Sequence, residues 1–289
     1  MIFFGSATPI SKLVGEEFPI LSASLFRVLL ATLVLLPFVL KDFKKNFKKM
    51  SQRDWLTVAG IALFGMVGFT VLLIYGMKFV SGVAGSLVMS LTPAVTAIGA
   101  YFFMNSPLGK KRLMAVALGV AGVVVVNVFK GKFAMGDSEN FLYGIAMVFL
   151  AICCEASYTL LGKRVMKDID PVFASFLGCA LSLPLFVGIA WIDFEYDKFI
   201  QAPLDRWLAL SWWGIATLGA GSVLWYRGVS KAEGTTAAGM MSVMPISALL
   251  LSYFLLGERF YLTHLLGIGL VLSSVGLMSW IHYKEAKKN

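Results

Sequence analysis

Apolar residues fill long segments of this chain, and the polar residues between them form short connections. A helix needs about 20 residues to cross the ~30 Å hydrocarbon core of a bilayer, and most of the segments reach that length. The pattern therefore predicts an all-α polytopic membrane protein with ten transmembrane helices. The predicted helices cover residues 1–14, 20–40, 54–77, 81–104, 111–129, 141–163, 171–192, 206–228, 232–256 and 261–282.

The first predicted helix is shorter than the others. Residues 1–14 precede a polar turn at Gly15–Glu17, and so few residues do not span a bilayer. Two interpretations stay open at this point. Either the native start lies upstream of Met1, or the first helix is short and only half inserted.

The composition agrees with a membrane protein. The 289 residues are 58% hydrophobic and only 14% charged, against about a quarter charged in a soluble domain. The net charge of +9 does not indicate nucleic-acid binding, because the basic residues lie in the connections and form no basic face with aromatics. Cys153, Cys154 and Cys179 all lie in apolar segments without metal-ligand spacing, so neither a disulfide framework nor a metal or other cofactor is predicted.

The chain repeats itself at an interval of 152 residues, from Pro19/Pro171 to Val123/Val275 without a gap. Tryptophan, proline and glycine rarely match by chance in an apolar chain, so their coincidence in one register indicates an internal repeat. We predict a first five-helix repeat over residues 1–137 and a second over 138–289. The matched pairs include Trp55/Trp207, Gly76/Gly228, Pro93/Pro245 and Tyr101/Tyr253.

Because five is an odd number, the second repeat must enter the membrane upside down. Connection 41–53 carries six basic residues and one acidic residue, whereas the equivalent connection 193–205 carries one basic and four acidic residues. Lys and Arg favour the cytoplasmic side, so equivalent connections of opposite charge indicate opposite sides. With 41–53 inside, 17 basic residues lie inside and 7 outside, and both termini are cytoplasmic. Inverted repeats around a central cavity are typical of secondary transporters.

Prolines stand at the centres of two equivalent predicted helices. Pro93 and Pro245 do not donate a backbone hydrogen bond, and each displaces the carbonyl four residues back, that of Met89 or Met241. A freed carbonyl in hydrocarbon needs a polar cavity or a nearby hydroxyl. These kinks either shape the packing only or line the transport pathway, where the methionines would offer an adaptable surface. The candidate hydroxyls belong to Ser90, Thr92 and Ser242.

Two charged residues lie deep in predicted helices. Glu155 is close to the centre of helix 141–163, where an ionisable group is by default a functional candidate. It would bind a proton or a cationic substrate, or it would form a structural hydrogen bond or ion pair. Tyr158 lies one turn further along the same face and offers a hydroxyl or a ring. Arg27 is either a structural residue that reaches the interface or a ligand for the substrate.

The segment SLFRVLLATLVLLP at 24–37, the motifs MSLTP and MSVMP, and LLGERF at 255–260 resemble the drug/metabolite transporter superfamily, specifically its EamA-type ten-helix permeases. The resemblance covers essentially the whole chain. It implies two inverted five-helix halves around a central cavity and export of small metabolites, often coupled to protons. Two positions depart from the family pattern: residues 105–107 lack the GER of the second half, and Glu155 replaces a common large aromatic.

Together these features predict a secondary active transporter. Its substrates would be small metabolites such as amino acids or drug-like compounds, carried by alternating access with proton coupling, and it would reside in a bacterial inner membrane. A flippase for lipids or lipid-linked metabolites is the alternative, because the same fold serves it. No enzyme is predicted, because the sequence contains neither a metal motif such as HExxH nor paired carboxylates at depth.

Overall fold

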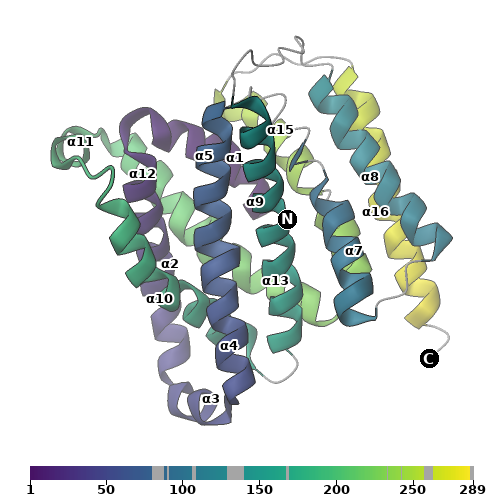
Figure 1. Ribbon diagram of the computed structural model, residues 1–289, viewed down its shortest axis with the longest axis horizontal. Coiled ribbons are helices and arrows are strands. Elements are labelled where there is room, and N and C mark those ends of the chain that lie inside the picture. The colour runs from purple at the N-terminus through teal and green to yellow at the C-terminus, as the bar shows by residue number, and fades with distance from the viewer. Residues whose placement is uncertain are drawn as a thin grey trace. The chain divides into compact units, whose positions relative to one another are not determined.

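The computed structural model of this chain is built from helices, and the residues that it describes form no β-strand (Figure 1). Helices satisfy their backbone hydrogen bonds internally, which apolar surroundings require. The described residues are 1–79, 88–89, 91–105, 109–128, 140–166, 169–232, 234–241, 243–256 and 263–286.

The helices form two compact units, which are described separately below. Unit 1 comprises Met1–Val67, Leu161–Ser230 and Ser247–Gly257. Unit 2 comprises Gly68–Leu160, Lys231–Ile246 and Glu258–Asn289. Each unit therefore combines segments from both predicted repeats.

Five of the helical stretches are long and apolar enough to cross a membrane, judged by length and composition within the described residues. They have between 20 and 28 residues, and shorter apolar helices accompany them. The chain is thus an all-helical protein with several candidate spans, and the count of ten stays a prediction. The five long stretches are Ile20–Leu40, Gln52–Phe79, Phe141–Val165, Pro171–Ala190 and Leu204–Ser230.

Two of these spans contain a π-helical segment at equivalent places. The segments η1 and η2 begin 152 residues apart and contain 8 residues each. π-Helices are rare and mostly brief, so two of equal length are unusual, and they recur at the interval of the predicted repeat. The consecutive elements are α4 (Gln52–Gly60), η1 (Ile61–Gly68) and α5 (Phe69–Phe79), and then α12 (Leu204–Trp212), η2 (Trp213–Ala220) and α13 (Gly221–Ser230).

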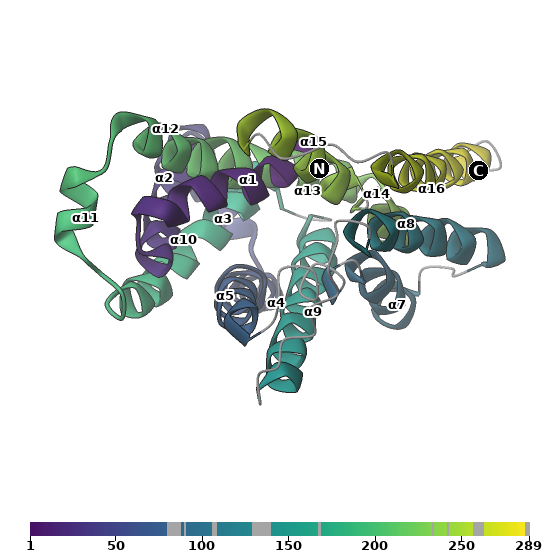
Figure 2. The same ribbon diagram turned by 90° about the horizontal axis from the view of Figure 1, so that it is seen from above.

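Unit 1 is organised around α2 (Ile20–Leu40), which packs along α10 (Pro171–Ala190) and against η2. The first helix, α1 (Ile2–Glu17), packs on α12 and η2 (Figures 1 and 2). The approach of η2 to α2 requires a glycine, because a Cβ atom at Gly214 would lie 2.8 Å from the carbonyl oxygen of Arg27.

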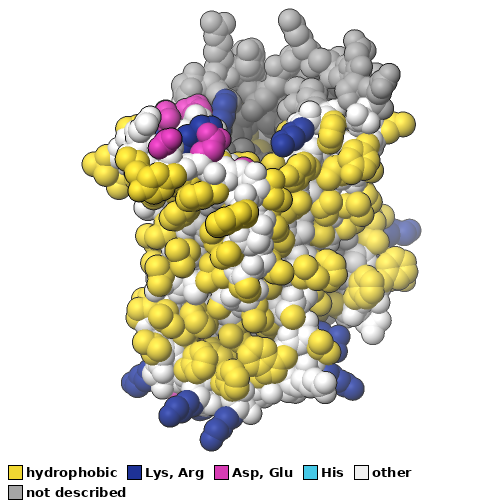
Figure 3. Space-filling model, turned by 60° about the vertical axis from the view of Figure 1, so that its left-hand side comes forward, with side chains coloured by type: hydrophobic (Ala, Val, Ile, Leu, Met, Phe, Trp, Pro, Cys, Tyr) yellow, Lys and Arg dark blue, Asp and Glu magenta, His cyan; other side chains and the backbone are white. Residues whose placement is uncertain are grey.

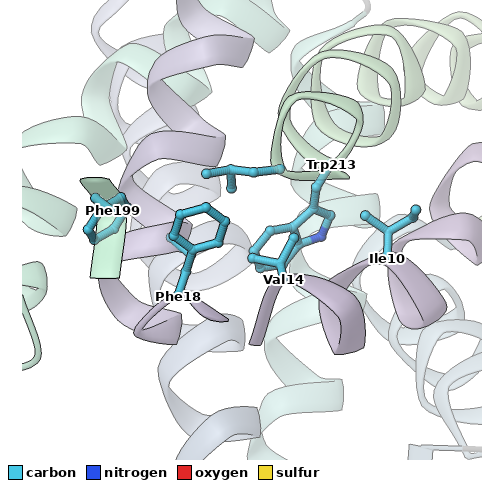
Figure 4. Close-up of a cluster of buried hydrophobic side chains, with 7 residues drawn as sticks. Ile10, Val14, Phe18, Phe199 and Trp213 are labelled. Carbon is cyan, nitrogen blue, oxygen red and sulfur yellow. The ribbon is translucent and has the colours of Figure 1, made fainter. Parts of the chain in front are cut away.

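An apolar cluster in unit 1 holds the acidic connection 193–205 against the helices (Figure 4). Phe199, on the short helix α11 (Tyr196–Gln201), lies with its ring centroid 5.1 Å from that of Phe18 and 4.8 Å from that of Phe26. Tilted aromatic pairs at such distances stabilise a core beyond the area they bury. The buried members are Ile10, Val14, Phe18, Ala23, Phe199, Leu210 and Trp213.

A carboxylate from the same connection caps α2. Asp193 accepts hydrogen bonds from the backbone N–H groups of Leu21 at 2.8 Å and Ser22 at 3.0 Å, and from the Ser22 hydroxyl at 2.7 Å. The first N–H groups of a helix have no partner within it, and the helix dipole favours a negative charge there. Asp193 therefore joins the end of α10 to the start of α2.

The two equivalent connections of unit 1 carry opposite charges at its two ends. Connection 41–53 contains α3 (Phe43–Lys49), whose lysines are exposed and whose Phe43 ring lies 5.6 Å from that of Phe173. Figure 3 shows Asp and Glu side chains gathered near one end of the visible face, Lys and Arg side chains near both ends, and a broad apolar surface between them. The gathering of acidic side chains at one end agrees with the charge asymmetry of the sequence.

Unit 2 contains a long antiparallel pair, α8 (Lys110–Val128) and α16 (Thr263–Ala286), which lie side by side in Figures 1 and 2. Near one end, a Cβ atom at Gly122 would lie 2.7 Å from the carbonyl oxygen of Gly267, so glycine lets the backbones approach. Further along, the Ser274 hydroxyl donates to the carbonyl oxygen of Ala115 at 2.6 Å.

The other elements of unit 2 pack through small residues as well. Gly76 of α5 faces Val148 of α9 (Phe141–Val165), where an added Cβ atom would lie 2.8 Å from a valine methyl group. The helix α14 (Gly234–Met241) packs on α7 (Thr92–Met104). The helix α15 (Val243–Leu256) begins in unit 2 and belongs to unit 1 from Ser247 onward.

The predicted segments correspond to helices where the structure describes them, but two details differ. The first helix, α1, continues through the predicted turn at Gly15–Glu17 and ends at Glu17. The connections contain the short helices α3 and α11, which have 7 and 6 residues and no long apolar run to predict them. The predicted helix 232–256 is described as α14 and α15, and Ser242 between them lies outside the description. The predicted helix 81–104 is described as α7 and a helical pair at 88–89, and its residues 81–87 lie outside the description.

We predict that Asp193→Ala destabilises the protein by about 2 kcal/mol, because the start of α2 loses a charged cap. Thermal unfolding of the purified protein in detergent micelles measures the effect. The matched control is Asp197→Ala, since Asp197 is exposed on α11 and makes no hydrogen bond with a described residue. Equal unfolding temperatures for the two variants would contradict the assignment of Asp193 as a cap.

Candidate functional site

The candidate site lies in unit 2, where α7 begins at a proline. Thr92 is the first residue of α7, and Pro93 follows it. The Thr92 hydroxyl donates to the carbonyl oxygen of Met89 at 2.8 Å. That carbonyl is the one that Pro93 leaves without an intrahelical partner, so a neighbouring side chain satisfies the helix break.

A carboxyl group from α9 reaches the same hydroxyl. The Oε2 atom of Glu155 lies 3.2 Å from the Thr92 Oγ1 atom. The close approach of α7 to α9 depends on Gly99, because a Cβ atom there would lie 2.7 Å from a methyl group of Leu160. The helix break and the buried carboxyl are therefore parts of one arrangement.

The Thr92 hydroxyl has one proton and two acceptors within reach. If the Glu155 carboxyl is protonated, it donates to Thr92, and Thr92 donates to the Met89 carbonyl, so that every group is paired. If the carboxyl is ionised, it competes with the carbonyl for the single hydroxyl proton. The arrangement thus connects the protonation of Glu155 to the hydrogen bonding of the helix break.

No ion pair joins Glu155 to any residue within the described part of the chain, and Thr92 is its polar partner there. An ionised carboxylate away from water is costly unless a cation or several hydrogen bonds compensate it. The site therefore favours either a proton on the carboxyl or a cationic group beside it.

A second polar contact extends this arrangement along α9. Thr159 lies one turn beyond Glu155, and its hydroxyl is 4.0 Å from the sulfur atom of Met241 at the end of α14. Tyr158 lies between Glu155 and Thr159 in the sequence and is buried, with 9% of its surface exposed. Three helices of unit 2, α7, α9 and α14, thus contribute polar or sulfur atoms to the candidate site.

Two further hydroxyls in α7 and α14 are buried without a hydrogen-bond partner among the described residues. They belong to Thr96, one turn beyond Thr92, and to Thr236. Buried hydroxyls are nearly always paired with protein atoms or ordered water. Their unfilled hydrogen-bonding capacity therefore marks them as candidates to bind water or a ligand.

The predicted site residues fall into three groups. The structure brings together Met89, Thr92 and Glu155, and it places Met241 against Thr159. Ser90 and Ser242 lie outside the described residues, and Pro245 lies in the first turn of α15. The sequence analysis missed Thr96 and Thr159, although each lies four residues beyond a predicted site residue and thus on its helix face.

Arg27 belongs to unit 1 and has an aromatic partner. Its guanidinium carbon lies 4.7 Å from the centroid of the Trp213 ring, at the contact between α2 and η2. Such a cation–π contact stabilises a partly buried charge. Whether Arg27 also binds substrate stays a prediction.

Cysteine, histidine and carboxylate side chains do not gather in the described residues. No group of three or more that would hold a metal ion occurs there. Cys153, Cys154 and Cys179 are free thiols within α9 and α10.

Several long apolar helices define a polytopic helical membrane protein, and a helix break and a buried carboxyl group lie among them. The chain belongs to the EamA-like transporter family, whose sequence profile matches residues 1–128 and 142–280. This match confirms the resemblance drawn from the sequence motifs. It also assigns the protein a general role in transport and points away from an enzyme.

Similar proteins carry transporter names and span most of the chain. "Uncharacterized transporter YetK" of Bacillus subtilis (strain 168) is 28% identical over 279 residues, which cover 95% of this chain and 83% of the relative. "Uncharacterized transporter YyaM" of the same organism is 23% identical and covers 95% of this chain and 89% of its own length. "WAT1-related protein At3g02690, chloroplastic" of Arabidopsis thaliana is 24% identical, covering 96% of this chain and 67% of the relative.

The fold also resembles a solved crystal structure. That structure matches with a TM-score of 0.77 and 16% sequence identity, and the match covers 98% of this chain and 96% of the other. At this identity the likeness concerns the fold alone. The fold and the family together describe an integral membrane transporter for a small-molecule substrate.

We predict that Thr92→Val destabilises the protein by about 1–3 kcal/mol, because the Met89 carbonyl loses its partner. The control is Thr96→Val on the same helix, which replaces an unpaired buried hydroxyl with a methyl group and should be neutral or stabilising. Thermal unfolding in micelles compares the two variants. An equal loss of stability in both would show that the Thr92 contacts do not matter.

Proposed function

We propose that the protein is a secondary active transporter that exports small metabolites, such as amino acids or drug-like compounds, in exchange for protons. The observation that carries this proposal is the Glu155 carboxyl, which contacts the helix break of α7 through Thr92 and has no ionic partner among the described residues. Intramembrane carboxyl groups commonly mark proton relays and ion pathways.

The proposed architecture is two inverted repeats, 1–137 and 138–289, with ten transmembrane helices around a central cavity. The recurrence of η1 and η2 at the interval of 152 residues supports the repeat. The opposite charges of connections 41–53 and 193–205 support the inversion and cytoplasmic termini. The Bacillus relatives support a bacterial inner membrane as the location.

The substrate class follows from the chemistry of the site. The described polar atoms around Glu155 are acceptors or hydroxyls: a carboxyl, the Met89 carbonyl and the Thr92 hydroxyl. A carboxylate with such neighbours attracts an ammonium group or another cationic donor. We therefore propose that the transported metabolites carry an amine, with methionine side chains tolerating different shapes.

The proposed cycle uses one carboxyl for two cations. On the inner side, Glu155 releases its proton, and the ammonium group of a substrate takes its place. After the site opens to the outer side, a proton binds the carboxylate and the substrate leaves. The return of the protonated site carries the proton inward, so the proton gradient drives export.

We predict that Glu155→Gln abolishes amine-driven proton movement, because glutamine neither binds a proton nor pairs with an ammonium group. The exchange of one ammonium group for one proton moves no net charge, so a pH-sensitive dye inside proteoliposomes would serve as the readout for amino acids, nucleobases and organic cations. Glu17→Gln, an exposed position on α1, is the matched control and should leave the proton flux unchanged.

The same experiment separates the alternatives. Amine-driven proton flux that persists in a folded Glu155→Gln protein would refute Glu155 as the coupling site. Lipid translocation in vesicles without any soluble substrate would instead favour the flippase of lipids or lipid-linked metabolites. Saturable proton flux driven by a soluble amine would argue against that flippase.

We predict that connections 41–53 and 193–205 lie on opposite sides of the membrane. Single cysteines, Lys48→Cys and Asp197→Cys, would be introduced into a variant that lacks Cys153, Cys154 and Cys179, since both positions are exposed. A membrane-impermeant maleimide should label position 197 in intact cells and position 48 only after permeabilisation. Labelling of both in intact cells would contradict the inverted repeat.

A further inference from the structure

One end of the α8–α16 pair brings lysine side chains from both helices to a single tryptophan. The Lys284 ammonium group lies 4.0 Å from the centroid of the Trp280 ring, and that of Lys111 lies 5.1 Å from it. Because α8 and α16 are antiparallel, the first turn of α8 lies beside the last turns of α16. Two cations from distant parts of the sequence therefore share one indole ring.

This cluster has an excess of positive charge. Lys110, Lys111 and Lys284 are exposed, and none of them forms an ion pair with a described residue. The first turn of α8 contains no acidic residue, and Arg112 follows Lys111 in it. The nearest acidic residue in the sequence is Glu285, whose side chain lies outside the description.

The arrangement attracts anions. Two ammonium groups lie near one ring, at 4.0 and 5.1 Å from its centroid. The amino-terminal end of a helix also carries a positive partial charge, and the lysines in the first turn of α8 add to it. An anion between Lys111 and Lys284 would be attracted by all of these charges.

The surroundings indicate what kind of anion fits. Leu113 and Met114, directly beyond the cluster on α8, expose 55% and 52% of their surfaces. Trp280 is 42% exposed, and tryptophan favours the boundary between the headgroups and the hydrocarbon. The charged end and the apolar surface beside it thus match a molecule with an anionic head and hydrocarbon chains.

We propose that Lys110, Lys111, Lys284 and Trp280 bind the phosphate headgroup of an anionic phospholipid. The phosphate lies between the two ammonium groups on the Trp280 ring, and the acyl chains cover Leu113 and Met114. Under the positive-inside rule this end faces the cytoplasmic leaflet, where anionic lipids attract basic clusters. The inference goes beyond the proposed transport function and does not depend on it.

Native mass spectrometry of the full chain tests this site, with phosphatidylglycerol and phosphatidylcholine offered in equal amounts. The wild type should retain phosphatidylglycerol preferentially. In the double variant Lys111→Gln/Lys284→Gln, the ratio of bound phosphatidylglycerol to bound phosphatidylcholine should fall about fivefold for each lysine removed. The matched control is Lys45→Gln/Lys49→Gln, which removes the same charge from exposed positions on α3 and should keep most of the preference.

Three outcomes would overturn the proposal. If both double variants lost the preference for phosphatidylglycerol equally, the net charge of the protein and not this site would attract the lipid. No preference of the wild type for phosphatidylglycerol would mean that no such site exists. Displacement of the lipid by millimolar inorganic phosphate would mean that free phosphate is the ligand. Unfolding temperatures in phosphatidylcholine confirm that each variant is folded, and because no transport is measured, the result is independent of Glu155.

Discussion

The structure depends on one constraint: in hydrocarbon, a backbone carbonyl or N–H group must find its partner within the protein. The long helices meet it with their own hydrogen bonds, and buried hydroxyls follow the same rule. Ser24 donates to the carbonyl oxygen of Ile20 and Thr32 to that of Val28, each within its own helix. Polar side chains are thereby kept inside the spans at little cost.

The same constraint explains why chemistry gathers where a helix is interrupted. At the start of α7 the backbone does not satisfy itself, so a side chain must do so, and Thr92 bonds to Met89. Once a hydroxyl is required there, a carboxyl on a neighbouring helix is able to compete for its proton, as Glu155 does. The hydroxyl that satisfies the helix break and a titratable carboxyl group therefore share one hydrogen-bond network within unit 2.

Much of this architecture could be read from the sequence, because hydrophobic length and proline position act locally. The spans, the break before Pro93 and the partner of the Met89 carbonyl follow from residues close together in the chain. Contacts between distant residues could not be foreseen. Asp193 caps a helix that begins more than 170 residues earlier, and Thr159 meets Met241 on another helix. Neither pairing leaves a periodic signal in the sequence.

The paired π segments have a consequence for any study that reads helix faces by periodicity. An α-helix turns by about 100° per residue, and a wider turn breaks that angular phase. A helical wheel drawn from α4 through η1 into α5 would therefore assign the later residues to the wrong side, and the same error would recur from α12 through η2 into α13. Scanning data across residues 52–79 and 204–230 should be fitted with two phases for each stretch, and the phase slip should fall at η1 in the first stretch and at η2 in the second.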